Sequence, residues 1–380
     1  MTVVNKLGEQ ELIDLSIGCT ILAGGGGGDP RIGLMMSIHA VRESGPVTMI
    51  GLDQVADDDL LFAAGMIGAP TVMVEKIPNG AEGKVIRASL EARLGRTVNA
   101  LMPLEMGGIN GLFPVAWAIN AGLPLVDGDL MGRAFPELQM CTPHLYGVPS
   151  WPCVLVDERS QAITFEPEGN VWLERLARGT VSVLGGCACA GLYPMTGAVA
   201  RTPVIAGTVS AAIRVGQALR TATDDPLSAM NEILPVYPLI TGKVVDVDRR
   251  TAGGFVRGAA VIEGIEQDVG RLVRIEFQNE NLVVLEDGDT IASVPDIITL
   301  LDRYTAQGIV TEHIRYGQRV IVAGFRSPEQ WRTAAGLAVV GPRAFGYQVD
   351  YVPVEERHER ARLGESAAPG VAAAAKRGRA

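Results

Sequence analysis

Five consecutive glycines, Gly24–Gly28, constrain the fold of this chain more than any other stretch. A short apolar segment at residues 20–23 precedes them, and Asp29-Pro30 follows. Because Asp is a preferred N-cap and Pro suits the first helical position, the pattern predicts a strand, a glycine loop and a helix. A loop without Cβ atoms lets a ligand approach backbone N–H groups at a helix N-terminus. The loop is therefore either a small-molecule site for a polar or anionic group or a turn that needs positive φ.

The glycine loop does not carry the known nucleotide-binding patterns. It matches neither GxGxxG with a downstream acidic residue nor GxxxxGK[ST]. We therefore expect no nucleotide cofactor, and we expect the loop to bind part of a small-molecule substrate. The residues expected to do so are Gly25, Gly26, Gly27 and Asp29.

Composition limits the classes of partner. A net charge of −10 argues against nucleic acid, because phosphate binding needs a basic face. No apolar run reaches the roughly 18 residues that span a bilayer, and the charged N-terminus lacks the apolar core of a signal peptide. We therefore expect a cytoplasmic protein with no membrane partner. A hydrophobic content of 47% over 380 residues allows two separate cores and makes a homo-oligomer an expectation.

Strands and helices alternate in the first half of the sequence. Apolar segments expected to be strands lie at residues 47–52, 60–66, 99–104 and 123–126, and helices are expected at 81–94 and 112–121. This predicts an α/β fold with a mostly parallel sheet, whose ligand crevice lies at the carboxyl ends of the strands. Glu105, Asp127 and Asp129 follow such strands, so we expect them beside the glycine loop together with Asn110. A plain Asp-Gly-Asp turn is the alternative for the two aspartates.

An irregular segment at residues 130–153 follows the last of these strands. Segments rich in Pro and polar groups are typical of functional loops or lids. It holds His144 and also Arg133, a candidate clamp for a substrate carboxylate. Arg133 can instead pair with Glu137, four residues on, along a helix. A hairpin at residues 154–165 then closes an N-terminal domain placed at residues 1–166.

The second domain is placed at residues 167–355 and becomes β-rich from about residue 240. Its first part is expected to contain a helix at 170–179, a strand at 180–184, a glycine-rich turn at 185–191 and a helix at 204–221. Beyond residue 241, apolar and polar residues alternate between Gly or Asn-Glu-Asn turns, which is typical of strands. A helix is expected at residues 297–304, and the tail at residues 364–380 is expected to be disordered.

The five cysteines form neither a disulfide framework nor a zinc-binding pattern, because their number is odd and no CxxC occurs. Cys189 falls in the expected glycine-rich turn between a strand and a helix. At such a turn a thiol can act as a nucleophile. The alternative is a packed cysteine at a close turn.

Four motifs in order along the chain resemble one family. They are GGGGGDPRIG, LEMGGINGL, DGDLMGRAFPELQM and GPRAFGYQVDYVPV, which begin at residues 24, 104, 127 and 341. Together they are similar to the S-methyl thiohydantoin desulfurase-like family, which is associated with hydantoinase/oxoprolinase proteins. The resemblance runs over roughly residues 8–355. It implies an N-terminal α/β domain, a β-rich C-terminal domain, and release of methanethiol from an S-methylated thiohydantoin in the catabolism of S-methylated ergothioneine. The alternative is a non-catalytic ligand-binding subunit that accompanies a hydantoinase-type partner.

Hydrolysis at the carbon that bears the S-methyl group needs an attacking water or thiolate, a base and an acid. Carboxylates in different environments can divide the acid and base roles. The candidate catalytic residues are Glu105, Asp127, Asp129, His144 and Cys189. Asp127, Asp129 and His144 are also candidates to hold one divalent metal, zinc or manganese, that activates the water.

Overall fold

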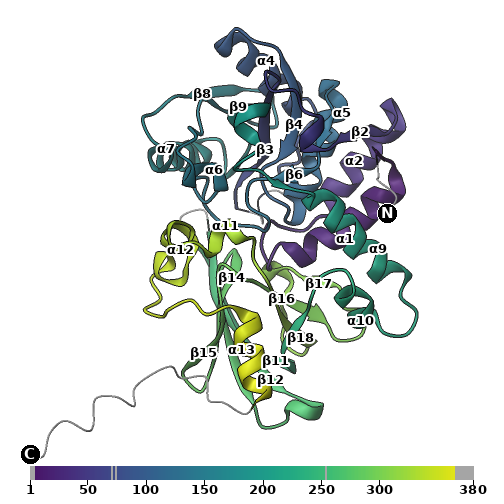
Figure 1. Cartoon of the computed structure of the whole chain (residues 1–380), viewed down its shortest axis with the longest axis vertical. Helices are drawn as coiled ribbons and strands as arrows, with labels where there is room; N and C mark the ends of the chain where they lie inside the picture. The colour runs from purple at the N-terminus through teal and green to yellow at the C-terminus, as the bar shows by residue number, and fades with distance from the viewer. Residues whose placement is uncertain (1–4, 70–71, 73–74, 253–254, 364–380) are drawn as a thin grey trace, which may run out of the picture.

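The structure is a computed structural model that describes residues 5–69, 72, 75–252 and 255–363. The tail expected to be disordered lies outside these residues. Two sheets of eight strands each form the N-terminal and C-terminal parts, which lie one above the other in Figure 1. The prediction of an α/β domain followed by a β-rich domain is confirmed.

The first sheet is mixed, with strand order β1-β2-β5-β4-β3-β9-β7-β8. Its strands are β1 (Lys6–Leu7), β2 (Val47–Ile50), β3 (Leu60–Gly68), β4 (Val98–Pro103), β5 (Leu125–Val126), β7 (Cys153–Val156), β8 (Ala162–Phe165) and β9 (Cys187–Thr196). The four strands predicted from alternation, β2, β5, β4 and β3, pair in parallel at its centre. The predicted hairpin is formed by β7 and β8. Strand β9 lies between β7 and β3 and is antiparallel to both. A separate short pair is formed by β6 (Gly128–Asp129) and β10 (Ile205–Ala206).

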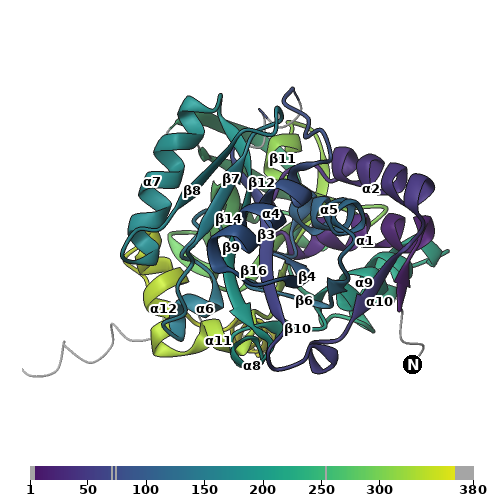
Figure 2. The ribbon, with the colours of Figure 1, turned by 90° about the horizontal axis from the view of Figure 1, so that it is seen from above.

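Helices cover both faces of this sheet. The helices of this part of the chain are α1 (Glu9–Leu22), α2 (Arg31–Ser44), α4 (Glu82–Leu94), α5 (Phe113–Ala121), α6 (Thr142–Leu145), α7 (Asn170–Val183), α8 (Gly197–Ala200), α9 (Thr208–Thr221) and α10 (Pro226–Asn231). Successive residues of a strand face opposite sides. Phe62 of β3 accordingly packs in the core with α1, α4 and α5, whereas Leu61 packs with α7. Figure 2 shows α2 and α7 at opposite sides of the molecule.

The second sheet is antiparallel throughout, with strand order β15-β14-β13-β12-β11-β18-β16-β17. Its strands are β11 (Tyr237–Ala252), β12 (Phe255–Gly264), β13 (Leu272–Gln278), β14 (Glu280–Glu286), β15 (Asp289–Ser293), β16 (Ile297–Asp302), β17 (Gly308–Ile309) and β18 (Arg319–Phe325). The helices α11 (Glu329–Arg332), α12 (Ala334–Val340) and α13 (Val354–Arg362) follow it, and short 3₁₀ turns include η2 (Gly108–Gly111), η4 (Thr311–His313) and η5 (Pro342–Phe345).

Three sequence predictions are wrong because short apolar runs do not distinguish a buried helix from a strand. Residues 20–22, expected to be a strand, form the last turn of α1, so the glycine loop connects two helices. Residues 180–183 continue α7 rather than forming a strand. The expected helix at residues 297–304 is largely strand β16, which pairs with β18.

The two domains share a continuous core. Ile297 and Phe325 of the second sheet belong to the same buried cluster as Leu15 of α1. The Thr299 hydroxyl also donates to the Ile21 carbonyl at 2.8 Å. Because α1 ends at this contact, the glycine loop begins at the junction between the domains. In the described part of the chain, no helix is long and apolar enough to cross a membrane.

Candidate functional site

The glycine loop is held between the two domains by backbone hydrogen bonds. The carbonyl of Gly24 accepts from Asn281 N at 2.8 Å, and the carbonyl of Gly25 accepts from Thr311 N at 2.8 Å. On the other side, the carbonyl of Gly27 accepts from Ile109 N at 2.9 Å. The loop therefore joins β14 and η4 of the C-terminal domain to η2 of the N-terminal domain.

The absence of side chains in this loop is needed for two reasons. Gly25 and Gly27 have φ values of 89° and 68°, which favour glycine. Gly26 has no such φ, but a Cβ there would lie 2.1 Å from Glu280 Oε1. The alternative interpretation, a turn that needs positive φ, is thus correct for part of the loop, and the rest packs directly on a carboxyl group.

Glu105 follows β4 and is buried at the cavity beneath the loop. Its Oε1 accepts from Asn110 Nδ2 at 2.7 Å, and its Oε2 accepts from Phe135 N at 3.1 Å. Burial raises the pKa of Glu105 to about 8, and the two hydrogen bonds oppose this shift. The group therefore titrates close to neutral pH, and its orientation is fixed by its donors.

Asp129 lies close to Glu105 but has a different role in the structure. It is fully buried, and its Oδ2 accepts from Met106 N at 2.8 Å and Gly132 N at 2.7 Å. Burial raises its pKa to about 7. Asp129 thus anchors the backbone on both sides of the cavity wall without lining the cavity itself.

Two other predicted catalytic residues lie elsewhere. Asp127 accepts from Ser210 N at 3.0 Å and from Ser210 Oγ at 2.6 Å, so it caps the start of α9. His144 Nδ1 lies 3.1 Å from Asn170 Nδ2, and burial lowers the pKa of this imidazole. Strand ends predict Asp127 beside Glu105, and the irregular segment at 130–153 supplies His144 as a candidate, but the two side chains have separate partners.

The predicted metal set is therefore not assembled. Asp127 accepts from Ser210, Asp129 accepts from backbone N–H groups through Oδ2 alone, and His144 lines a different cavity. Among the residues that the structure describes, no group of three or more His, Cys, Asp or Glu side chains is placed to hold a metal ion. These donors do not fit a divalent metal centre.

Arg133 is fully buried between the domains. Its Nη1 donates to the carbonyls of Pro295 at 2.9 Å and Asp296 at 2.6 Å, and its guanidinium lies 4.6 Å from the centre of the Phe135 ring. Burial lowers its pKa to about 10, so it remains charged at neutral pH. The predicted pairing with Glu137 is wrong, because Glu137 accepts from the Gln139 side chain instead.

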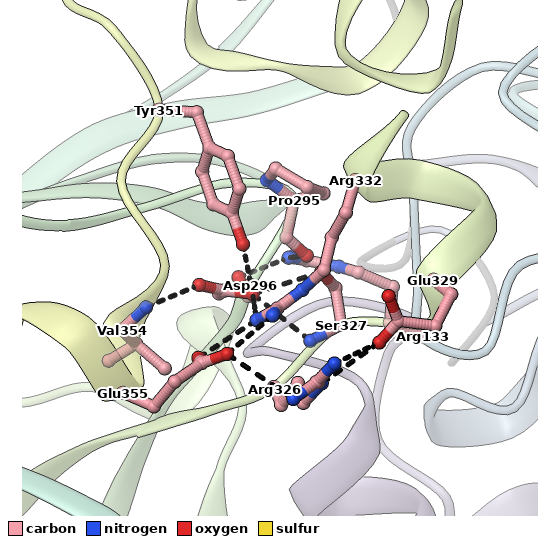
Figure 3. A network of polar contacts seen from close by, with 10 residues as sticks. All are labelled: Arg133, Pro295, Asp296, Arg326, Ser327, Glu329, Arg332, Tyr351, Val354 and Glu355. Carbon is pink, nitrogen blue, oxygen red and sulfur yellow. Dashed lines mark hydrogen bonds and ion pairs between the residues drawn. The ribbon is translucent and has the colours of Figure 1, made fainter. Parts of the chain in front are cut away.

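The carbonyls that bind Arg133 are fixed by a buried network around Asp296 (Figure 3). Asp296 Oδ1 accepts from Arg332 Nη2 at 2.9 Å and from Tyr351 Oη at 2.9 Å, and Oδ2 accepts from Val354 N at 2.8 Å. The network ties the end of the fourth sequence motif to the start of β16. It therefore connects the C-terminal segment with Arg133 at the domain junction.

Glu280 is the acidic residue of the site that the sequence interpretation missed. It begins β14 within the Asn-Glu-Asn segment, whose composition predicts only a turn, and it is 3% exposed. Burial raises its pKa well above the usual value, and the Arg133 guanidinium opposes the shift. The available signal was a carboxylate between two asparagines in an otherwise alternating strand pair, but nothing in it indicates a partner in the other domain.

A cavity of about 50 Å³ brings these groups together. Its polar lining includes Glu105, Asn110, Glu137, Arg178, Asn279 and Glu280, and Gly27, Met66, Met131, Phe135 and Leu138 are among its other walls. A second cavity of about 450 Å³ is lined by residues that include His144, Arg257 and Phe345. Glu137 lines both cavities. Of the predicted binding residues, Gly27 and Asn110 line the smaller cavity, whereas Asp29 binds Arg31 at the start of α2.

Cys189 does not lie at a turn between a strand and a helix. It lies near the start of β9, paired with Met66 of β3, and its Sγ lies 3.4 Å from Met66 Sδ. Burial raises the pKa of this thiol well above its usual value. The prediction failed because Gly-Cys-Ala-Cys-Ala-Gly is a strand of small residues packed under α4, not a loop.

Fold and site together define a two-domain α/β protein with a carboxyl-lined cavity between its domains. Residues 10–167 match the model of the S-Me-THD-like N-terminal domain, and residues 168–354 match that of the S-Me-THD-like C-terminal domain. The chain therefore belongs to the S-Me-THD-like family. The part matched by the second model includes β9, which lies in the first sheet.

A protein from Chromobacterium violaceum, solved by X-ray crystallography in a structural genomics programme, has a similar fold. It is 21% identical, with a TM-score of 0.76, over 92% of this chain and 99% of that one. No curated protein matches the chain in a sequence search.

Proposed function

We propose that this protein is a hydrolase of a small cyclic amide-like heterocycle, with an S-methylated thiohydantoin as substrate and methanethiol as product. The observation that carries the proposal is Glu105: a carboxyl group with a pKa of about 8, held by Asn110 and Phe135 N at a cavity between two domains. A group that titrates near the working pH is suited to proton transfer. Family membership supports the substrate class.

In the proposed reaction, the carboxylate form of Glu105 takes a proton from a water molecule that attacks the ring carbon bearing the S-methyl group. The C–S bond then breaks, and the methanethiolate receives a proton. The products are the cyclic ureide, which carries the water oxygen, and methanethiol. The buried positive charge of Arg133 favours negative charge developing nearby.

Ligand binding requires the cavity to widen. A volume of about 50 Å³ is far below the roughly 300–1,000 Å³ of ordinary ligand sites. The wall formed by Phe135–Leu138 separates this cavity from the larger one, because Glu137 lines both. Movement of this wall would join the two spaces.

The test is incubation of the purified protein with S-methyl thiohydantoin propionate and detection of methanethiol with a thiol reagent. We expect release by the wild type, with a rate that rises with pH through about 8, and at least a 100-fold slower release by Glu105→Gln. Binding of the compound without release would instead favour the non-catalytic ligand-binding subunit. If the compound is neither bound nor hydrolysed, the proposed substrate is wrong.

Three further parts of the proposal need separate measurements. Elemental analysis of the purified chain tests whether a divalent metal accompanies it, although the donors described above do not form a site for one. Size-exclusion chromatography with light scattering tests the homo-oligomer. Co-purification with a hydantoinase-type protein tests that partner.

A further inference from the structure

Three buried polar atoms beneath the glycine loop have no hydrogen-bond partner among the described residues. They are Arg133 Nη2, Glu280 Oε2 and Asn281 Oδ1. Buried polar groups are nearly always paired, so a cluster of unpaired ones indicates a space for a ligand or water.

The three side chains lie against successive residues of the loop. A Cβ on Gly24 would lie 2.8 Å from Arg133 Nη2, and one on Gly26 would lie 2.1 Å from Glu280 Oε1. Between them, a Cβ on Gly25 would lie 2.5 Å from Asn281 Nδ2. The unpaired groups therefore form one cluster, and Glu280 is its member that also lines the small cavity with Glu105.

Glu105 and Glu280 reach this cavity from different domains and in different environments. Both oxygens of Glu105 accept hydrogen bonds from fixed donors, which favours its carboxylate form. Glu280 Oε2 accepts none. Of the charged groups around Glu280, Arg133 favours its ionised form, whereas Glu105 and Glu312 oppose it. The environments thus separate the two carboxyl groups into a base and an acid.

We propose that Glu280 is a second catalytic residue, the acid that donates its proton to the sulfur of the departing thiolate while Glu105 activates the water. This inference rests on the proposed function. Charge and atoms balance. Glu105 gains a proton from the water, and Glu280 loses a proton to the sulfur. Transfer of one proton from Glu105 to Glu280 then restores both carboxyl groups for the next turnover. The active site is then complete only when both domains are folded together.

The experiment compares Glu280→Gln with a matched control, Glu276→Gln. Glu276 lies on the neighbouring strand β13 and pairs with Arg274 at 3.0 Å, away from the cavity. We expect Glu280→Gln to lower kcat for the S-methyl substrate 100-fold or more and the control to retain it. With an S-(4-nitrophenyl) analogue, whose thiolate leaves without help from an acid, we expect the loss in Glu280→Gln to shrink to less than 10-fold. A merely structural residue would impair both substrates equally.

Rates of Glu280→Gln equal to those of the control, or an equal loss with both leaving groups, would overturn the inference. A second readout does not depend on turnover: the infrared band of a protonated carboxyl group at pH 7 should weaken in Glu280→Gln and not in Glu276→Gln. Absence of methanethiol release by the wild type would overturn the proposed function. In that case, an infrared band of the same strength in Glu280→Gln and in the wild type would also show that Glu280 is not protonated at pH 7. A weaker band in Glu280→Gln would still support its protonated form.

Discussion

The amide of Asn110 holds Glu105 by one hydrogen bond and β3 by another. Its Nδ2 donates to Glu105 Oε1 at 2.7 Å, and its Oδ1 accepts from Met66 N at 2.7 Å. The second bond fixes the orientation of the amide, so that an N–H and not a C=O faces the carboxyl group. Asn110 is therefore a positioning residue that favours the ionised form of Glu105.

Replacement of Asn110 should shift the pH dependence of the reaction. Asn110→Ala removes a donor to a carboxylate, a bond worth about 1.5–3 kcal/mol, or roughly one to two pKa units. We expect the rising limb of the rate profile to move to higher pH by about one unit or more, as measured by methanethiol release between pH 6 and 10. Asn120→Ala, near the end of α5, is the control: it removes an amide that donates to the Gly80 carbonyl at 2.8 Å, and it should leave the profile unchanged. If the rate profile of Asn110→Ala does not shift, Glu105 is not the group whose ionisation controls the rate.

Glu105 should also make stability depend on pH. Its pKa rises from 4.5 to about 8 on folding, so the folded state binds the proton more tightly than the unfolded chain. The free energy of unfolding therefore falls as pH rises from about 4.5 to about 8 and levels off above, by an amount on the order of a few kcal/mol. Glu105→Gln should flatten this dependence in urea titrations at pH 5, 7 and 9. Asp129, with a pKa of about 7, contributes in the same direction and remains in the variant.

The sequence predicted the half of the site that depends on local order along the chain. Alternating strands and helices place polar residues at the ends of parallel strands, and this locates Glu105 and Asn110 correctly. The same logic grouped Asp127 with Asp129, which share a strand end but face different partners. Side-chain direction there depends on one short pairing, β6 with β10, that no periodicity indicates.

The other half of the site comes from the second domain and was not predictable from pattern. Glu280 lies 175 residues after Glu105, and its place depends on how the antiparallel sheet packs on α1. The glycine run predicts a close approach to the loop backbone, and the group that approaches Gly26 is the Glu280 carboxyl. A long-range contact of this kind leaves no trace in composition or spacing.

Gly26→Ala should displace Glu280. The added Cβ would lie 2.1 Å from Glu280 Oε1 and 2.6 Å from its Cδ, so the carboxyl group must move. We expect an overpacking cost of about 1–3 kcal/mol in the free energy of unfolding and a fall in kcat larger than stability alone explains. Gly179→Ala, in α7 with nothing within 4 Å of the added atom, is the matched control. Full activity in Gly26→Ala would contradict a role for the position of Glu280.

Asp296→Asn should destabilise the domain junction. It weakens the contacts with Arg332 and Tyr351 and leaves a buried guanidinium with less compensation, so we expect a loss of about 2–4 kcal/mol in urea unfolding. Asp350→Asn removes an exposed pair with Arg343 and should cost about 0–1 kcal/mol. Equal stabilities of the two variants would show that the Asp296 network is not what holds the C-terminal segment.

Cys189→Ala distinguishes water from a thiolate as the nucleophile. The thiol is buried in β9 against Met66, and burial raises its pKa well above the usual value, which disfavours the reactive thiolate. We expect the variant to release methanethiol at the wild-type rate while losing about 1 kcal/mol of stability from the small cavity created. Iodoacetamide should leave Cys189 unlabelled in the folded protein, as judged by mass spectrometry. Loss of turnover in a folded Cys189→Ala protein would indicate that this thiol is the nucleophile. Glu105 would then not be the base that activates a water molecule.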